Sequence, residues 1–403
     1  MGFRILTVIG TRPEAIKLAP VIRQMAMQPS VEPVICVTAQ HREMLDDVLR
    51  LFEITPDYDL DIMKRHQTAS GVFAAVLERI EPVIAEVRPH FALVQGDTTT
   101  TVAAALAAFH ERVPVGHVEA GLRTDRLYDP FPEELNRRLT TQLTTLHFAA
   151  TQRAVDRLLV EGVTSDRVHL TGNPIVDAVQ WIRARGAHAG DGKGRMILVT
   201  AHRRENLGAP LARICAALRM LVAEHPDVSI VYPVHPNPLV TEPVRAALGA
   251  TPRIRLLPPV SYDELLTYME EAYLVLTDSG GLQEEATVLG RPVLIMRETT
   301  ERQEAIEAGA AELVGTDPIR IVDRVTRLLR DPAAYARMAT PRNLFGDGHA
   351  AERIVDIIRE FLLATEAAAP SAREHAAPGP LEKKTVRPAQ GHTSLRTGTG
   401  ALG

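Results

Sequence analysis

Short apolar runs alternate with longer amphipathic segments along most of the chain. The apolar runs are rich in β-branched residues and predict buried strands at Ile5–Ile9, Val34–Val37, Phe91–Val94, Val113–Val118, Met196–Val199, Val228–Tyr232, Tyr273–Leu276 and Val293–Met296. The amphipathic segments predict helices at Ala15–Ala26, Glu43–Phe52, Val72–Ala85, Val102–Phe109, Leu211–Ala223 and Leu282–Leu289. This alternation is typical of βα units on parallel sheets, so we expect an α/β protein.

A break in composition divides the chain. Residues 184–195 contain four glycines and no large apolar residue, and a second series of strands follows them. We therefore expect two doubly wound, Rossmann-like units that face each other across a cleft. We assign residues 1–172 to the first unit and residues 173–350 to the second, which then begins with the helical segment before the break. A helix over 351–365 could pack back on the first unit. Residues 366–403 have too few large aliphatic side chains for a core and are expected to be a disordered tail.

The composition argues against several classes of function. The chain has 45 Lys and Arg against 50 Asp and Glu, a net charge of −5, which gives no electrostatic reason to expect nucleic acid or a membrane as partner. Cys36 and Cys215 lie in apolar stretches without metal-ligand spacing, as buried thiols of a reducing compartment do. The first apolar run is too short for a signal peptide or a membrane span, so we expect a cytoplasmic protein.

Two strand-to-helix loops are candidate phosphate sites. In IGTRPEAIK, Arg12 and Lys17 flank a helix start with Pro13 in its first turn. In LTDSGGLQEEA, small residues around Ser279 and Gly280 would let an anion approach the free N–H groups of a helix start. Ordinary capped turns with solvated charges explain each loop equally well when it is taken alone.

Ser279 could be an N-cap, a phosphate donor or both. Of Glu284 and Glu285, one could face outward while the other accepts two hydroxyl hydrogen bonds from a ribose. Phosphate-type turns in both halves favour a nucleotide held between the two units.

Three carboxylates are expected near the strand ends of the first unit: Asp97, Glu119 and one from the pair Glu133 and Glu134. Asp97 and Glu119 follow neighbouring predicted strands, and Glu133 and Glu134 begin a predicted helix after Pro132. Helix capping by Asp97 and helix-dipole stabilisation by the glutamates are the alternatives. Several carboxylates beside an anionic nucleotide repel it and one another, which costs free energy unless some of them bind protons. Such a cluster therefore favours acid–base chemistry.

Histidines follow two strands of the second unit. His202 lies in TAHRREN beside two arginines, which suits phosphate contact or proton transfer, and His235 lies in YPVHPNP, where the prolines could simply fix a turn. No HExxH, paired CxxC or EF-hand loop is present, so no metal site is predicted. No GxGxxG follows a strand, so a bound NAD has little support, and no cofactor is expected.

Together these segments closely resemble the bacterial non-hydrolysing UDP-N-acetylglucosamine 2-epimerases. The resemblance covers about residues 3–363 and rests on GTRPEAIKLAP, VTAQHREM, GDTTTT, GHVEAGLRT, PEELNRRLT, TGNPIVDA, TAHRREN, YPVHPNP, TDSGGLQEEA, GRPVLIMRETTERQEA and LVGTD. It implies a glycosyltransferase-B-type fold, a UDP-sugar substrate, and reversible conversion of UDP-N-acetylglucosamine to UDP-N-acetylmannosamine by elimination of UDP and re-addition to a glycal. It also implies a homodimer and a role in the supply of cell-envelope polysaccharide.

The resemblance assigns roles to matching positions. Catalytic positions are Asp97, Glu119, Glu133 and His202, and substrate contacts are Arg12, Lys17, His235, Ser279, Gly280 and Glu285. Gln40, His41 and Arg42 match residues that bind a second, activating UDP-sugar in many members. Rival interpretations are a glycosyltransferase of the same fold, a sugar-nucleotide-binding regulator, and a variant acting on a more heavily modified UDP-sugar.

Overall fold

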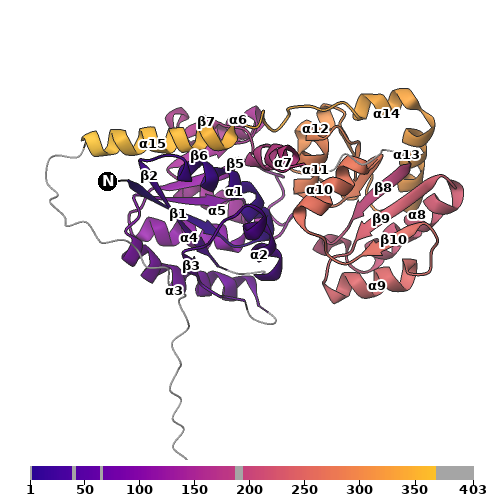
Figure 1. The fold of residues 1–403 in the computed structure, drawn as a ribbon, viewed down its shortest axis with the longest axis horizontal. Helices are drawn as coiled ribbons and strands as arrows, with labels where there is room; N and C mark the ends of the chain where they lie inside the picture. Colours follow the sequence, from indigo (N-terminus) through magenta and orange to yellow (C-terminus); the bar gives the residue numbers. More distant parts are fainter. Residues whose placement is uncertain (1, 39–41, 64–66, 187–193, 369–403) are drawn as a thin grey trace, which may run out of the picture.

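Two parallel sheets, one from each half of the chain, organise the molecule (Figure 1). The computed structural model describes residues 2–38, 42–63, 67–186 and 194–368. The first sheet has the order β3-β2-β1-β4-β5-β6-β7, formed by β1 (Phe3–Ile9), β2 (Val31–Val37), β3 (Tyr58–Asp59), β4 (Phe91–Gln95), β5 (Val115–Ala120), β6 (Leu146–Ala149) and β7 (Val168–Leu170). The second has the order β10-β9-β8-β11-β12-β13, formed by β8 (Arg195–Thr200), β9 (Val228–Pro233), β10 (Ile254–Leu257), β11 (Leu274–Thr277), β12 (Val293–Ile295) and β13 (Ala311–Leu313).

Helices follow most strands and cover both sheets (Figure 1). Those of the first half are α1 (Arg12–Ala26), α2 (Arg42–Leu51), α3 (Ala69–Val87), α4 (Thr99–His110), α5 (Glu133–Leu143) and α6 (Gln152–Val160). α7 (Pro174–Ala184) precedes the second sheet, whose helices are α8 (Ala209–Glu224), α9 (Pro238–Leu248), α10 (Tyr262–Glu271), α11 (Gly280–Val288), α12 (Gln303–Glu307), α13 (Pro318–Arg330) and α14 (Pro332–Met338). α15 (Ala350–Ala368) ends the described chain, and short 3₁₀ turns lie at Ser165–Arg167 and Arg204–Asn206.

The sheets are buried on both faces, as parallel sheets require. In β1, Ile5 and Ile9 pack in the cluster that includes α1 and α2, whereas Leu6 and Val8 pack in the cluster that includes α3 and α4. Both Cys36 and Cys215 are buried free thiols, as predicted. The apolar runs therefore alternate between two cores.

The predicted strands all overlap observed ones, and both sheets are parallel, which confirms the expected α/β class. The sequence analysis missed β3, β6, β7, β10 and β13. These strands have only two to four residues each and lie at or next to sheet edges. Such short runs carry too little periodicity to stand out from the surrounding loops.

The chain crosses between the two halves twice, and the crossings touch. A side chain at Gly172 would lie 3.0 Å from the Gly346 Cα atom, and one at Gly346 would lie 3.1 Å from the Gly172 Cα atom. Both residues have positive φ, 84° and 126°, which glycine adopts without strain. The Asn173 N–H donates to the Phe345 carbonyl at 2.6 Å beside them. The domain boundary at residue 172 stays a prediction.

After the second crossing, α15 returns to the first half and packs against α1 and α7 (Figure 1). Phe361 on α15 meets Phe91 of β4 edge-on, with ring centroids 5.9 Å apart. The helix runs three residues past the predicted end at 365, and 369–403, the remainder of the predicted tail, lies outside the described residues. Within the described ranges, no helix is both long and apolar enough to cross a membrane.

Candidate active site

Each sheet reverses its strand order between two central strands, β1 and β4 in the first and β8 and β11 in the second. Ligands of doubly wound sheets bind at the carboxyl ends of such strands. Arg12 follows β1 and Asp97 follows β4, while His202 follows β8 and Ser279 follows β11. The predicted site residues therefore lie at the favoured edge of each sheet.

Glu119 lies at a break in the regular strand pairing. The register of β5 against β6 shifts between Val118 and Ala120, and Glu119 has a φ of 66°. Non-glycine residues rarely adopt this conformation, and its cost is of order 1–3 kcal/mol. The kink turns the Glu119 side chain into a set of polar groups rather than into the apolar core.

Four side chains donate hydrogen bonds to the buried Glu119 carboxylate. Its Oε1 accepts from Lys17 Nζ at 2.5 Å, from Arg302 Nη2 at 3.0 Å and from Asn173 Nδ2 at 3.1 Å. Its Oε2 accepts from Gln95 Nε2 at 2.5 Å. Burial raises the pKa of a carboxyl group, but Lys17 and Arg302 outweigh this effect and lower the pKa of Glu119 to about 2. Glu119 is therefore an ionised carboxylate that both halves of the chain hold.

Glu284 shares the same cations from the second half. Lys17 Nζ lies 3.5 Å from Glu284 Oε2, Arg302 Nε donates to Oε1 at 2.9 Å, and Asn173 Nδ2 donates to Oε2 at 3.1 Å. Burial raises the pKa of Glu284 to about 7 in spite of these partners. The two carboxylates compete for one group of donors, and Glu119 holds the charge more strongly.

Asp97 forms an ion pair and does not cap a helix. Thr98 caps α4 by accepting from the Thr101 N–H at 3.2 Å. Asp97 Oδ2 instead accepts from Arg137 Nε at 2.9 Å and Nη2 at 2.7 Å. Arg137 Nη2 also lies 3.8 Å from Glu301 Oε1, which connects Asp97 to the second half of the chain.

Glu133 and Glu134 begin α5, as predicted, but in different surroundings. Glu134 is fully buried and accepts hydrogen bonds from Arg137, Arg138 and the Thr124 N–H. Glu133 is partly exposed, and burial followed by the nearby charge of Asp97 raises its pKa. Of this pair, Glu133 is therefore the glutamate with a partly exposed side chain and a raised pKa.

The loop after β8 is held by a carboxylate that follows β11, the strand beside β8 in the sheet. Asp278, at the end of β11, accepts at Oδ2 from the backbone N–H groups of His202 and Arg203, both at 2.8 Å, and from Asn206 Nδ2 at 3.0 Å. The His202 ring stacks on the His235 ring with centroids 5.1 Å apart. The structure thus brings together the two histidines that the sequence analysis selected.

Glu285 is a buried acceptor with an unused oxygen. Its Oε1 accepts from the Tyr262 hydroxyl at 2.8 Å, while its Oε2 has no hydrogen-bond partner within the described part of the chain. Burial raises its pKa, and it interacts with the Arg12 guanidinium, whose own pKa burial lowers. Both Glu284 and Glu285 are buried, so the expectation that one faces outward is wrong: α11 packs against α7 and β12 and has no solvent-facing side at these positions.

Ser279 and Gly280 form the start of α11. Ser279 occupies the N-cap position, but its hydroxyl makes no capping hydrogen bond. A side chain at Gly280 would lie 2.9 Å from Arg302 Nη1 and 3.0 Å from Glu301 Oε1, both buried groups. A larger residue here would push the ends of these two paired side chains away from the start of α11.

The remaining predicted site residues are Lys17 and the three residues matched to the activator site. The Lys17 side chain forms ion pairs with Glu119 and Glu284. It is therefore not directed to an anion at the start of α1, as the sequence pattern indicated. Gln40 and His41 lie outside the described residues, as does the side chain of Arg42.

The sequence analysis missed the buried partners of the selected acids. These are Arg137, Asn173, Tyr262, Asp278 and Arg302, together with Glu301. Glu301 and Arg302 come shortly after the apolar run Val293–Met296, but so do other charged residues, and nothing local in the sequence marks these two as buried.

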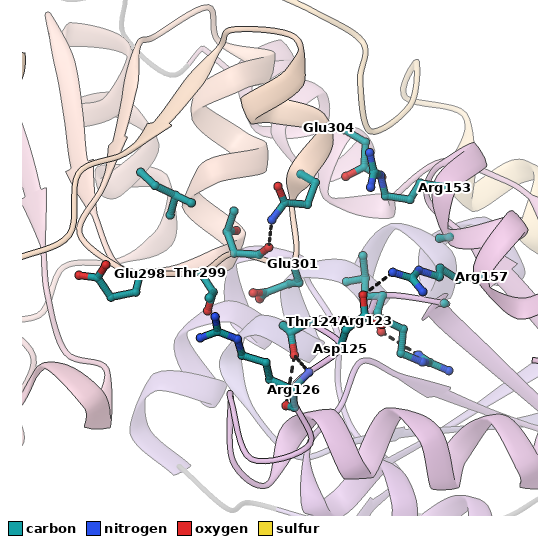
Figure 2. Close-up of a pocket in the computed structure, with 16 residues that line it drawn as sticks. Arg123, Thr124, Asp125, Arg126, Arg153, Arg157, Glu298, Thr299, Glu301 and Glu304 are labelled. Carbon is teal, nitrogen blue, oxygen red and sulfur yellow. Dashed lines mark hydrogen bonds and ion pairs between the residues drawn. The ribbon is translucent and has the colours of Figure 1, made fainter.

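Beside this network lies a cavity of about 280 Å³ between the two halves, with Glu301 in its wall (Figure 2). Figure 2 shows arginines and carboxylates around it. Arg123 pairs with Glu161, and Arg157 pairs with Asp125. The arginines are matched by acidic side chains, so the cavity has no net positive charge to attract a diphosphate. Neither Arg12, Ser279 nor Glu285 lines it.

Comparison with known proteins identifies the family of the chain. The sequence pattern of the UDP-N-acetylglucosamine 2-epimerase family matches residues 23–359. The chain belongs to this family. UDP-N-acetylglucosamine 2-epimerases of Yersinia pestis and Escherichia coli K12 are 50% and 49% identical to it over 369 residues, which span 88% of this chain and 98% of each relative.

Solved structures of the family are similar over the same region. The Neisseria meningitidis UDP-GlcNAc 2-epimerase bound to UDP-GlcNAc has a TM-score of 0.85 and 43% identity, covering 89% of this chain and all (100%) of that one. An S. aureus protein in complex with UDP has a TM-score of 0.84 and 43% identity, covering 90% and 97%. Sucrose-phosphate synthase of Thermosynechococcus elongatus, at 12% identity and a TM-score of 0.62 over 90% and 100%, shares the fold alone. The family fold is thus the expected glycosyltransferase-B type.

Proposed function

We propose that the protein interconverts UDP-N-acetylglucosamine and UDP-N-acetylmannosamine by eliminating UDP and adding it back to a glycal. The observation that carries this proposal is Glu119, a buried carboxylate kept ionised by cations from both halves of the chain. The charge of Arg137 also acts on Glu119, and Arg137 pairs with Asp97. Burial, followed by the charge of Asp97, raises the pKa of Glu133. Family membership and relatives crystallised with UDP-GlcNAc or UDP support the choice of substrate.

The chemistry of the sugar explains why several acids are needed. The proton at C2 is not next to a carbonyl group, so direct deprotonation at neutral pH would be very slow. Loss of UDP from C1 develops positive charge that acidifies C2, and a positioned carboxylate can then remove the proton. UDP adds back when a proton is delivered to the opposite face of C2. An acid and a base in different positions are therefore required, and the route leaves no net oxidation or reduction.

The second half of the chain offers groups for the nucleotide. Arg12 from the facing loop, His202 and the start of α11 at Ser279 and Gly280 would stabilise the departing diphosphate. Glu285 would accept hydrogen bonds from the ribose hydroxyls with its unused Oε2. His235 would support this end of the site through its stacking on His202. In this assignment Lys17 contributes by keeping Glu119 charged.

A single experiment in heavy water tests the reaction. Purified protein given UDP-N-acetylglucosamine alone should form UDP-N-acetylmannosamine, with deuterium at C2 of the product, because the proton removed need not be the proton returned. Chromatography with mass spectrometry measures both. A glycosyltransferase would need an acceptor and a regulator would leave the sugar unchanged, so the absence of a new sugar nucleotide would contradict the proposal. Product without deuterium would point to a hydride route.

The ribose contact predicts a specific loss of UDP affinity in Glu285→Ala. Hydrogen bonds to a charged group contribute about 1.5–3 kcal/mol, so UDP should bind roughly 10- to 100-fold more weakly by calorimetry. A matched ligand sharpens the test. The wild type should prefer UDP over 2′-deoxy-UDP, whereas Glu285→Ala should bind the two alike. If the variant keeps the wild-type preference, Glu285 does not contact the ribose.

A further inference from the structure

The loop that carries His202 depends on one carboxylate whose two oxygens are used differently. Asp278 is fully buried. Its Oδ2 accepts three hydrogen bonds, from the backbone N–H groups of His202 and Arg203 and from the Asn206 amide. Its Oδ1 is buried and has no hydrogen-bond partner among the residues that the structure describes. An unsatisfied oxygen of this kind costs free energy unless a donor reaches it.

The group that faces this oxygen is the His202 ring. Nδ1 of His202 lies 3.6 Å from Asp278 Oδ1, slightly beyond hydrogen-bond distance. The His202 side chain is 36% exposed and therefore not fully enclosed, and a small rotation of the ring would close this gap. Only a proton on Nδ1 would satisfy the buried oxygen, because an unprotonated Nδ1 would set two acceptors against each other.

His235 provides the opposite case in the same stack. Its Nδ1 accepts a hydrogen bond from the Asn237 N–H at 3.2 Å, so the proton of the neutral His235 ring is on Nε2. The two rings lie nearly parallel, 10° apart, with centroids separated by 5.1 Å. The structure thus places two stacked imidazoles in surroundings that favour opposite tautomers.

From these contacts we infer that Asp278 is a positioning residue: it holds His202 as the Nδ1–H tautomer and leaves Nε2 as the atom presented to the ligand. This inference rests on the proposed function only for what Nε2 does there. When a proton adds to Nε2, Asp278 stabilises the resulting cation through Nδ1–H, and Nε2–H can donate to the departing diphosphate. A carboxylate behind an imidazole has this effect in general, by fixing both the tautomer and the ring orientation.

The variant Asp278→Asn separates this role from loop support. The three donors on Oδ2 require an oxygen there, so the amide NH₂ of the new side chain must face His202 Nδ1. That NH₂ group is a donor, so it should shift the proton of the neutral ring from Nδ1 to Nε2. Asn206→Ala is the matched control, because it removes one donor to Oδ2 and the bond to the Met296 carbonyl but leaves the ring contact unchanged.

Two-bond ¹⁵N–¹H correlations of ¹⁵N-histidine-labelled, ligand-free protein at a pH of about 8.5, about two units above the ordinary imidazole pKa, read the tautomers directly. Comparison with His202→Gln assigns the signal. We expect Nδ1–H in the wild type and in Asn206→Ala, Nε2–H in Asp278→Asn, and Nε2–H for His235 throughout. A wild-type His202 signal of the Nε2–H form, or one unchanged by Asp278→Asn, would overturn the inference. If Asp278→Asn fails to fold, the His202 signal of the wild type still tests whether Nδ1 carries the proton that faces Asp278.

Kinetics supply the second readout. Because the diphosphate charge develops as the C1 bond breaks, Asp278→Asn should lower kcat on the order of 10- to 100-fold while KM changes only a few-fold. Equal losses in Asp278→Asn and Asn206→Ala, with unchanged tautomers, would reduce Asp278 to a support of the loop. If the tautomers appear as expected but the wild type does not epimerise the sugar, the proposed function fails while the positioning role of Asp278 stands.

Discussion

Glu119→Gln should lower kcat for epimerisation by about 10²- to 10⁴-fold, the usual contribution of a general acid–base group. The substitution keeps the size of the side chain but removes the charge that Lys17 and Arg302 hold in place. Incorporation of deuterium at C2 in heavy water should fall together with turnover, because the same proton transfer governs both. UDP affinity should change much less, since the proposed nucleotide contacts lie elsewhere.

A control must separate proton transfer from the loss of one buried charge. Glu134→Gln removes a carboxylate that is equally buried and also bound to arginines, but that has no proposed contact with the sugar. Its loss of kcat should stay within about tenfold. If both variants lose activity to the same extent, the general charge balance of the network explains the effect, and Glu119 has no special role in proton transfer.

Arg302→Met should destabilise the folded protein by about 3–5 kcal/mol, the cost of breaking a buried ion pair from one side. Arg302 lies within hydrogen-bond distance of Glu119, Glu284 and Glu301, all of which are buried. Without it, these carboxylates must share Lys17 and the remaining arginines or take up protons. Urea denaturation at neutral pH, followed by circular dichroism, measures the loss.

Arg138→Met is the matched comparison for Arg302→Met. Arg138 also pairs with a fully buried carboxylate, that of Glu134, but its own side chain is 43% exposed. Water can replace an exposed cation, so this variant should lose at most about 1 kcal/mol. Arg302→Lys should not restore the wild-type stability, because one ammonium group cannot reproduce the planar fork that reaches several carboxylates. Similar losses in Arg302→Met and Arg138→Met would contradict the assignment of Arg302 as the central cation.

The positions of the acids could be predicted from the sequence, but their partners could not. Asp97 follows β4 and Glu119 is the last residue but one of β5, so the strand predictions already place both at the carboxyl edge of the first sheet. The donors to Glu119 lie 102 residues away at Lys17, 54 at Asn173 and 183 at Arg302. No local periodicity reports contacts at such separations, because they depend on how the two halves meet.

The misplaced predictions have a common physical cause. A charged residue near a helix start is most often solvated, which is why one of Glu284 and Glu285 was expected to face outward and Lys17 to face an anion. In this fold, helix α11 and the start of α1 lie where the two halves meet, so side chains that would be exposed on an isolated βα unit are buried. Burial between units reverses the usual preference of charged residues.

The contact between Gly172 and Gly346 has a mechanical consequence. The two linkers touch at one point, so any rotation of one half against the other would be centred on this contact. Glu119 binds Asn173, the residue next to this contact, whereas the Asp97 carboxylate binds Arg137, which lies 3.8 Å from Glu301 of the second half. Such a rotation would displace Glu119 only slightly, because it lies close to the axis. Groups farther from the contact between the linkers would be displaced more.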